Sequence, residues 1–131
     1  MIAGYRVGES AGERERMSKT YELGEVVAER RVEAVAADGA RTPVVVRIGK
    51  PLPDPLPGGD WFCPGQILGL GDEAVRASFG IDSLQAFLLS VYGIRLTLRE
   101  RAEAASVTLD WLGQPDLGLK VDPEVHRLTG A

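Results

Sequence analysis

The sequence predicts an α+β fold, in which an antiparallel sheet of about four to six strands carries one main α-helix on one face. Several short segments alternate apolar and polar residues and are separated by short turns, which favours antiparallel pairing. One longer stretch repeats its apolar residues at three and four positions, as in a helix that packs on a sheet. The chain has 131 residues, enough for a single domain. We expect four strands, then the helix, then short strand additions.

A hairpin is predicted near the start of the domain. Residues 25–36 alternate between a polar and an apolar face, and residues 41–49 resume the alternation. Asp38 and Gly39 stand between them, a pair that suits the positive φ angles of a two-residue type I′ turn. Pro43 cannot donate a backbone hydrogen bond, so we place it at the start of its strand or on a sheet edge.

The segment 50–59 contains alternating prolines followed by two glycines. Alternating prolines favour an extended polyproline-like backbone, so we predict a semi-rigid connector and not a strand. A surface loop is the simpler interpretation of this segment. A docking peptide for a proline-recognising module, with Pro55 and Pro57 exposed, is the alternative.

Two further strands are expected before the helix. Residues 60–70 are extended in character, and Pro64 with Gly65 predicts a bulge or bend within them. A turn at Gly71–Asp72 then leads into residues 73–79, which alternate with a period of two.

The main helix is predicted to begin after Asp82. Its carboxylate can cap the helix while Gln85 reaches back, which is the spacing of a capping box. We expect the helix to continue to about Glu103, with a possible break near Gly93. Residues 94–99 also alternate, so a strand there is an open alternative.

After the helix, residues 107–112 suggest another extended piece. Residues 113–116 read as a turn, and the apolar alternation over 117–121 predicts a last short strand.

The predicted domain organisation is simple. Residues 1–20 have no useful apolar period, so we expect a disordered or weakly ordered tail. Residues 21–121 form the single α+β domain, and residues 122–131 form a frayed C-terminal tail.

Charge and cysteine content limit the partners and the compartment. The net charge is −4, which disfavours nucleic acid and anionic membranes but permits a basic protein partner. Cys63 is the single cysteine, so no intrachain disulfide can form. The first twelve residues lack the apolar region of a signal peptide, and no apolar run reaches the length of a membrane span. We expect a cytoplasmic protein.

Motifs for catalysis or cofactors are weak. Residues 69–74 match the loose dinucleotide pattern G-x-G-x-x-A, but Asp72 would lie against the phosphates, so a turn between strands is the better interpretation. Cys63 would need a base, and His126 lies 63 residues later in the predicted tail. We therefore predict no catalytic residue, no metal site and no cofactor.

Three arginines cluster near the end of the predicted helix. Arg95, Arg99 and Arg101 could clamp a phosphate or carboxylate. Acidic neighbours interleave with them, which favours a solvated helix face.

The candidate partner-binding surface lies around the proline-rich segment. Trp61 follows that segment, and tryptophan is enriched at interface hot spots; packing over the sheet edge is its other interpretation. The predicted partner-binding residues are Pro55, Pro57, Trp61, Phe62, Cys63 and Gln66.

The function predicted from the residues is a non-catalytic binding or interaction module. One alternative is an immunity-like or defence-associated protein that blocks a basic toxin. Another is a small enzyme whose pocket between helix and sheet is lined by Cys63, Gln66 or Asp82. A homodimer through strand pairing or through the helix face is also open.

Three motifs follow the predicted strand pair: Trp61-Phe62-Cys63-Pro64, Gly69-Leu70-Gly71 and Gly80-Ile81-Asp82-Ser83-Leu84-Gln85-Ala86. They form an aromatic-Cys-Pro segment, a G-x-G turn and a G-[VI]-D-[AS]-x-Q-A helix start. With these features, over roughly residues 25–100, the chain resembles a family of small bacterial domains of unknown function. The resemblance implies a shared architecture, and the family supplies no established activity.

Overall fold

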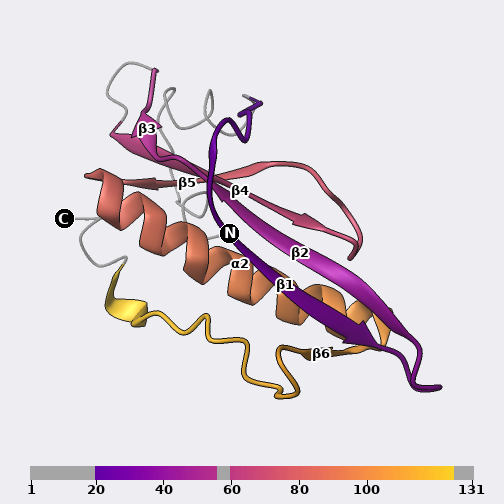
Figure 1. Cartoon of the computed structure of the whole chain (residues 1–131). Helices are drawn as coiled ribbons and strands as arrows, with labels where there is room; N and C mark the ends of the chain where they lie inside the picture. Colours follow the sequence, from indigo (N-terminus) through magenta and orange to yellow (C-terminus); the bar gives the residue numbers. More distant parts are fainter. Residues whose placement is uncertain (1–19, 56–59, 126–131) are drawn as a thin grey trace.

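Among the residues that the structure describes, the strands pair in one antiparallel sheet and one long helix lies along one face of it (Figure 1). This computed structural model describes residues 20–55 and 60–125. Within them the sheet has six strands in the order β3-β4-β2-β1-β6, and β5 pairs with the free side of β4. The α+β prediction is confirmed. The elements are β1 (Val26–Val35), β2 (Arg41–Gly49), β3 (Leu52–Pro53), β4 (Trp61–Leu68), β5 (Arg76–Gly80), α2 (Ser83–Ala105) and β6 (Thr108–Asp110).

The β1–β2 hairpin forms where it was predicted, but its turn is not type I′. The Gly39 N–H donates to the Ala36 carbonyl, and the Ala36 N–H donates to the Ala40 carbonyl, both at 2.9 Å. Gly39 has a φ of 86°, whereas Asp38 keeps a negative φ. The Asp38 carboxylate instead accepts from the Ala40 N–H at 2.9 Å, which stabilises a longer loop with one left-handed residue.

The proline-rich connector contains a strand, contrary to prediction. Leu52 and Pro53 form β3, and pair with Phe62 and Trp61 of β4. This strand is at the sheet edge, where a proline can pair on one side without needing an N–H for a second neighbour.

Strand β4 runs unbroken through Pro64 and Gly65, so the predicted bulge or bend is wrong. Its ladder with β5 is regular through both residues, ending where Gly65 faces Arg76. On the other side, β3 pairs only with the start of β4 and β2 only from Gly65 onward. Pro64 therefore lies in the gap between two ladders, where a proline is tolerated.

The start of α2 confirms the predicted cap. Asp82 Oδ1 accepts from the Gln85 N–H at 2.8 Å, and Gln85 Oε1 accepts from the Ile81 N–H at 2.7 Å. The two side chains satisfy two backbone donors that a helix start would otherwise leave without partners. The Gln85 amide also donates to the Val125 carbonyl at 2.9 Å, which ties a short turn after residue 121 to the helix.

Helix α2 continues through Gly93 to Ala105, so neither the break near Gly93 nor the strand at 94–99 exists. Ile94 and Leu98 are buried against the sheet and keep the helical spacing across the glycine. Packing of this face therefore outweighs the weak helix propensity of one residue.

The main core lies between α2 and the sheet, and a smaller cluster lies on the opposite face. In the smaller cluster the Tyr21 ring is 4.7 Å from the Phe62 ring and packs edge-on to Phe79. The buried residues of the main core are Val32, Ala34, Val44, Val46, Ile48, Cys63, Ile67, Leu70, Ala86, Ile94 and Leu98.

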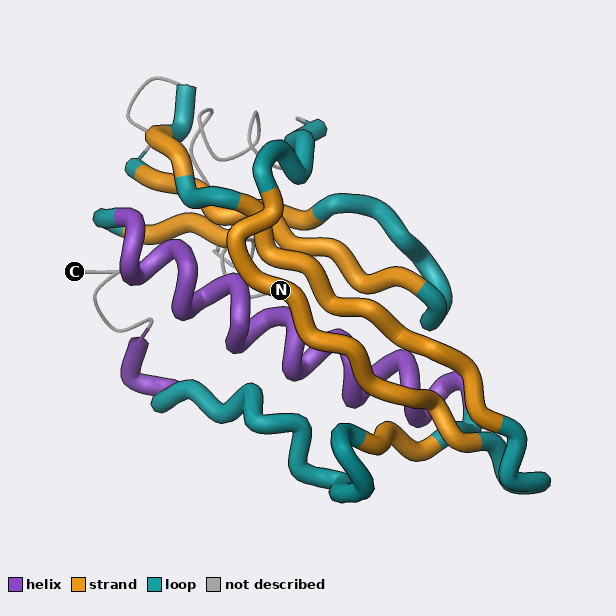
Figure 2. The backbone as a smooth tube through the Cα atoms, viewed as in Figure 1, coloured by secondary structure: helices purple, strands orange, loops and turns teal. Residues whose placement is uncertain are grey.

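The segment after β6 is an irregular strap that runs beside α2, so the predicted strand at 117–121 is wrong (Figure 2). Arg30 of β1 holds the strap. Its Nη1 donates to the Leu117 carbonyl at 2.9 Å, and its guanidinium lies 3.8 Å from the centre of the Trp111 ring. These contacts replace the strand ladder that alternation alone suggested.

Helix α2 and β5 approach so closely that one glycine substitution should destabilise the fold while a nearby one stabilises it. A Cβ at Gly80 would lie 2.5 Å from the Ala86 backbone nitrogen, whereas a Cβ at Gly93 meets nothing nearer than Ser78 Oγ at 3.9 Å. We expect Gly80→Ala to lower the free energy of unfolding by about 1–3 kcal/mol. Gly93→Ala should raise it by about 0.5–1 kcal/mol. Urea unfolding of both variants measures this, and equal effects would contradict the close approach.

Candidate functional site

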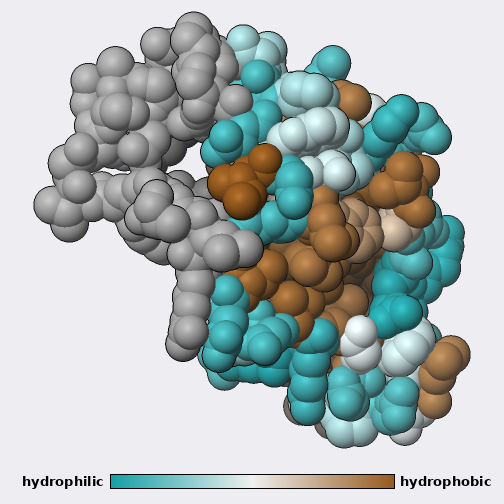
Figure 3. Space-filling view, turned by 90° about the vertical axis from the view of Figure 1, so that its left-hand side faces the viewer, coloured by the Kyte–Doolittle hydropathy of each residue, from teal (hydrophilic) through white to brown (hydrophobic). Residues whose placement is uncertain are grey.

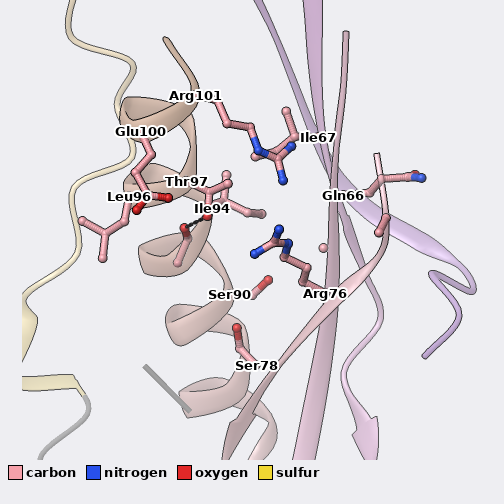
Figure 4. Close-up of a pocket in the computed structure, with 13 residues that line it drawn as sticks. Gln66, Ile67, Arg76, Ser78, Ser90, Ile94, Leu96, Thr97, Glu100 and Arg101 are labelled. Carbon is pink, nitrogen blue, oxygen red and sulfur yellow. Dashed lines mark hydrogen bonds between the residues drawn. The ribbon is translucent and has the colours of Figure 1, made fainter. Parts of the chain in front are cut away.

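A groove of about 250 Å³ opens between the second half of α2 and strands β4 and β5 (Figure 4). The last pair of the β4–β5 ladder is Gly65 with Arg76, and the groove lies at this end of the ladder. The groove residues that carry polar groups are Gln66, Arg76, Ser78, Ser90, Thr97, Glu100 and Arg101.

Two glycines, Gly65 and Gly93, keep this groove open. A Cβ at Gly65 would lie 2.9 Å from Ile94 Cδ1 and 3.0 Å from Ser90 Oγ, so helix and strand can be this close only at a glycine. Gly93 lines the groove from the helix side. The absence of both side chains leaves space beside the two serine hydroxyls.

Arg101 fixes the turn between β4 and β5 to the helix. Its Nη1 donates to the Leu70 carbonyl at 3.2 Å and also to the Asp72 carbonyl. The G-x-G pattern is thus a turn between antiparallel strands, as predicted. The three arginines predicted as one cluster separate: Arg99 is exposed, whereas Arg101 is half-buried and lines the groove.

Arg76 enters the groove from β5. Its Nη2 lies 3.6 Å from Asp72 Oδ2, and both groups are solvent-exposed. The pKa of Asp72 is lowered, first by a hydrogen bond from the Ala74 N–H and then by the charges of Arg101 and Arg76. Asp72 is therefore ionised at neutral pH and balances one of the two guanidinium charges.

The guanidinium groups of Arg76 and Arg101 lie near each other in the groove, while the Glu100 carboxylate is turned toward Leu96 (Figure 4). Asp72 is paired to Arg76 and Glu100 also lines the groove, so two carboxylates balance the two guanidinium charges. The fork-shaped donors of the two arginines are the usual recognition groups for phosphate and carboxylate.

Three hydroxyl groups extend the polar lining below the arginines. Ser78 is 8 % exposed, and its hydroxyl makes no hydrogen bond to the described residues and is open to the groove. Ser90 is buried on α2, close to Cys63. Thr97 Oγ1 donates to the Gly93 carbonyl at 2.9 Å and keeps its acceptor capacity.

Cys63 lies in the core and not in the groove lining. Its side chain is fully buried, and its Sγ donates to the Gly49 carbonyl at 3.4 Å. Burial raises the pKa of the Cys63 thiol to about 11, and a hydrogen bond with Ser90 offsets part of this rise. At neutral pH the thiol is protonated and not nucleophilic.

The residues predicted as a partner surface do not form one patch. Phe62 is buried in the small cluster, and Trp61 is half-buried against the main core. The Gln66 amide donates to the Glu73 carbonyl at 2.8 Å and belongs to the groove. Pro55 is in an exposed loop, and Pro57 lies outside the described residues.

Sequence reasoning missed most of the groove. Arg76 and Ser78 share one face of β5, and this two-residue spacing was a usable signal. Ser90 gave no signal, because a serine in an apolar helix is ordinarily structural. Asp82, considered for an enzyme pocket, caps the far end of α2.

These features define an α+β domain with a polar groove between its helix and a sheet edge. A family model described as Domain of unknown function (DUF6968) matches residues 28–121, and the chain belongs to this family. Searches of the curated proteins and of the solved structures each found no match. Within the described residues, no His, Cys, Asp or Glu cluster could hold a metal ion, and no helix has the length and apolarity to cross a membrane.

The burial of Cys63 predicts a pH dependence of stability. The thiol pKa rises from 9.0 in the free state to about 11 in the fold, so ionisation favours the unfolded chain. The preference of the fold for the protonated thiol stabilises it fully below pH 9. As the pH rises toward 11 this contribution to the free energy of unfolding is lost, by up to about 2 kcal/mol. Urea unfolding at pH 8.5 and 10.5 measures the loss. Cys63→Ala, which lacks the thiol, should lose less; an equal loss would refute the assignment.

Proposed function

We propose that the protein binds a small anionic ligand in the groove between α2 and β4–β5. The observation that carries this proposal is the pair of guanidinium groups from Arg76 and Arg101 that project into the groove, while Asp72 is paired with Arg76 and the Glu100 carboxylate is turned toward Leu96. This is a binding function, in line with the interaction module expected from the sequence, but it uses a different surface.

The arginines retain donors for a ligand. Both hydrogen bonds of Arg101 in the described structure use Nη1, so Nε and Nη2 still carry N–H groups for an anion. The turn carbonyls hold the Arg101 guanidinium in place before any ligand arrives. A donor fixed in advance loses less conformational entropy on binding.

Inorganic phosphate is the simplest probe of this site. We expect it to bind with a Kd on the order of 1 mM, detected by chemical-shift changes of groove amides in ¹H–¹⁵N spectra. Arg76→Gln should weaken binding about tenfold, because it removes a charge-assisted hydrogen bond. Arg101→Lys should weaken it as well, while keeping the charge near the turn.

Arg99→Gln is the matched control, because Arg99 is an exposed arginine on the same helix that does not line the groove. It should bind phosphate as the wild type does. A titration with sodium chloride at the same ionic strength shows which spectral changes come from general charge screening and which from binding at the groove. Equal weakening by Arg99→Gln and Arg76→Gln would show that the protein attracts phosphate only through its overall field.

We infer a second candidate function, the docking of a basic protein partner at the end of the molecule where α2 begins. That side has an apolar patch at its centre with hydrophilic residues around it (Figure 3). Ile81 and Leu84 are 52 % and 64 % exposed there, and Trp61 is next to them because it pairs with Gly80. A toxin blocked by this protein would be one such partner.

Charge supports a basic partner. Exposed Asp60 and Asp82 adjoin Trp61 and Ile81, and the whole chain has a net charge of −4. An apolar centre with a charged rim is typical of a protein interface, and the acidic rim favours a partner of opposite charge.

Two exposed leucines test this docking surface. Leu84→Ala should reduce recovery of a basic partner from native lysate at least about fivefold, since buried interface side chains are worth more than 1 kcal/mol. Leu112→Ala, at 83 % exposure beyond β6, should leave recovery unchanged. Quantitative mass spectrometry of co-purified proteins compares the two, and equal recovery would rule out the surface.

A further inference from the structure

We propose that the ligand of the groove is a small hydroxylated anion, a polyol that carries a phosphate or a carboxylate. This inference rests on the proposed anion-binding function and adds the class of the ligand. The feature that carries it is the row of hydroxyl groups that continues the groove lining beside Arg76 and Arg101; among them, the Ser78 hydroxyl makes no hydrogen bond to the described residues and is open to the groove.

Strand geometry places Ser78 and Arg76 together. Residues two apart on a strand share one face, so both side chains of β5 are directed toward α2. Ser78 is more than nine-tenths buried, and its hydroxyl points into the space below the Arg76 guanidinium (Figure 4). The Ser78 hydroxyl makes no hydrogen bond to the described chain and is open to the groove, so both its donor and its acceptor are available to a ligand.

Helix α2 supplies matching groups from the other wall. Ser90, Thr97 and Arg101 line the groove along one face of α2, at spacings of seven and four residues. Thr97 donates to the helix backbone and so offers an acceptor to a ligand hydroxyl. The groove therefore has a cationic end at the two arginines and a hydroxyl-lined end at Ser78 and Ser90.

The dimensions limit the ligand to a short polyol. A volume of about 250 Å³ equals that of about eight water molecules at roughly 30 Å³ each. It falls below the roughly 300–1,000 Å³ of pockets for drug-sized ligands. A three- or four-carbon polyol with one anionic group fits this space, whereas a nucleotide does not.

Glycerol 3-phosphate and propyl phosphate test the inference, because they share the phosphate and differ only in two hydroxyl groups. We expect glycerol 3-phosphate to bind about tenfold more tightly, as one or two partly buried hydrogen bonds provide. Ser78→Ala should reduce this ratio to about one while changing the propyl phosphate Kd by less than about twofold. Ser83→Ala, an exposed serine at the start of α2, should keep the ratio.

Glycerate and propionate form the second pair and distinguish the two anionic groups. Tighter binding of glycerol 3-phosphate than of propyl phosphate identifies the ligand as a polyol phosphate. If only glycerate binds more tightly than its partner propionate, the ligand is a hydroxy acid. Both results support a hydroxylated anion. Thermal unfolding of Ser78→Ala checks the fold, and its midpoint should be unchanged because the hydroxyl is open to the groove and makes no hydrogen bond to the described chain.

Failure of this inference differs from failure of the proposed function. If phosphate binds but propyl phosphate binds as tightly as glycerol 3-phosphate, the anion site stands and hydroxyl recognition is wrong. A tenfold ratio that persists in Ser78→Ala also overturns the inference, since the hydroxyls would be read elsewhere. If none of the anions binds up to 50 mM, about fifty times the expected Kd, both proposals fail.

Discussion

The close approach of α2 to β4 and β5 is the constraint on which the rest of this structure depends. At Gly80 it requires the absence of a side chain, because a Cβ there would lie 2.5 Å from the Ala86 backbone nitrogen. At Gly65 a Cβ would lie 2.9 Å from Ile94 Cδ1, so that side chain would have to shift. The two glycines therefore let the helix lie near the sheet. Everything along its groove face, from Ser90 to Arg101, is positioned by this close approach.

Both ends of this packed helix are anchored to loops, which makes the groove walls stiff. At the start, Gln85 bonds the backbone of Ile81 and of Val125 through the two ends of its amide. Near the end, Arg101 holds the carbonyls of the turn after β4. A site between two such anchored elements keeps its geometry without a ligand, which is what tight recognition by a small groove requires.

Local patterns were enough to predict the hairpin and the capped helix, because each is determined by residues close in sequence. The capping spacing of Asp82 and Gln85 is one example. The errors came from contacts between distant residues. Gly93 stays helical because Ile94 and its neighbours pack on the sheet, and the segment 117–121 is irregular because Arg30, almost ninety residues earlier, binds its carbonyls. Alternation and propensity carry no information about such partners.

The candidate site could not be predicted from local patterns either, because its residues are distant in sequence. Arg76 and Ser78 have the spacing of any two-faced strand, and Ser90 resembles a structural serine in an apolar helix. Only the fold brings them together, and only there is Ser78 recognisable as a hydroxyl that makes no hydrogen bond to the described chain and opens onto a groove beside two guanidinium groups. The packing of α2 on β4 and β5 aligns these groups, and no local sequence pattern contains that alignment. The strongest indication of function is therefore the convergence of polar groups from a helix and a strand on one groove.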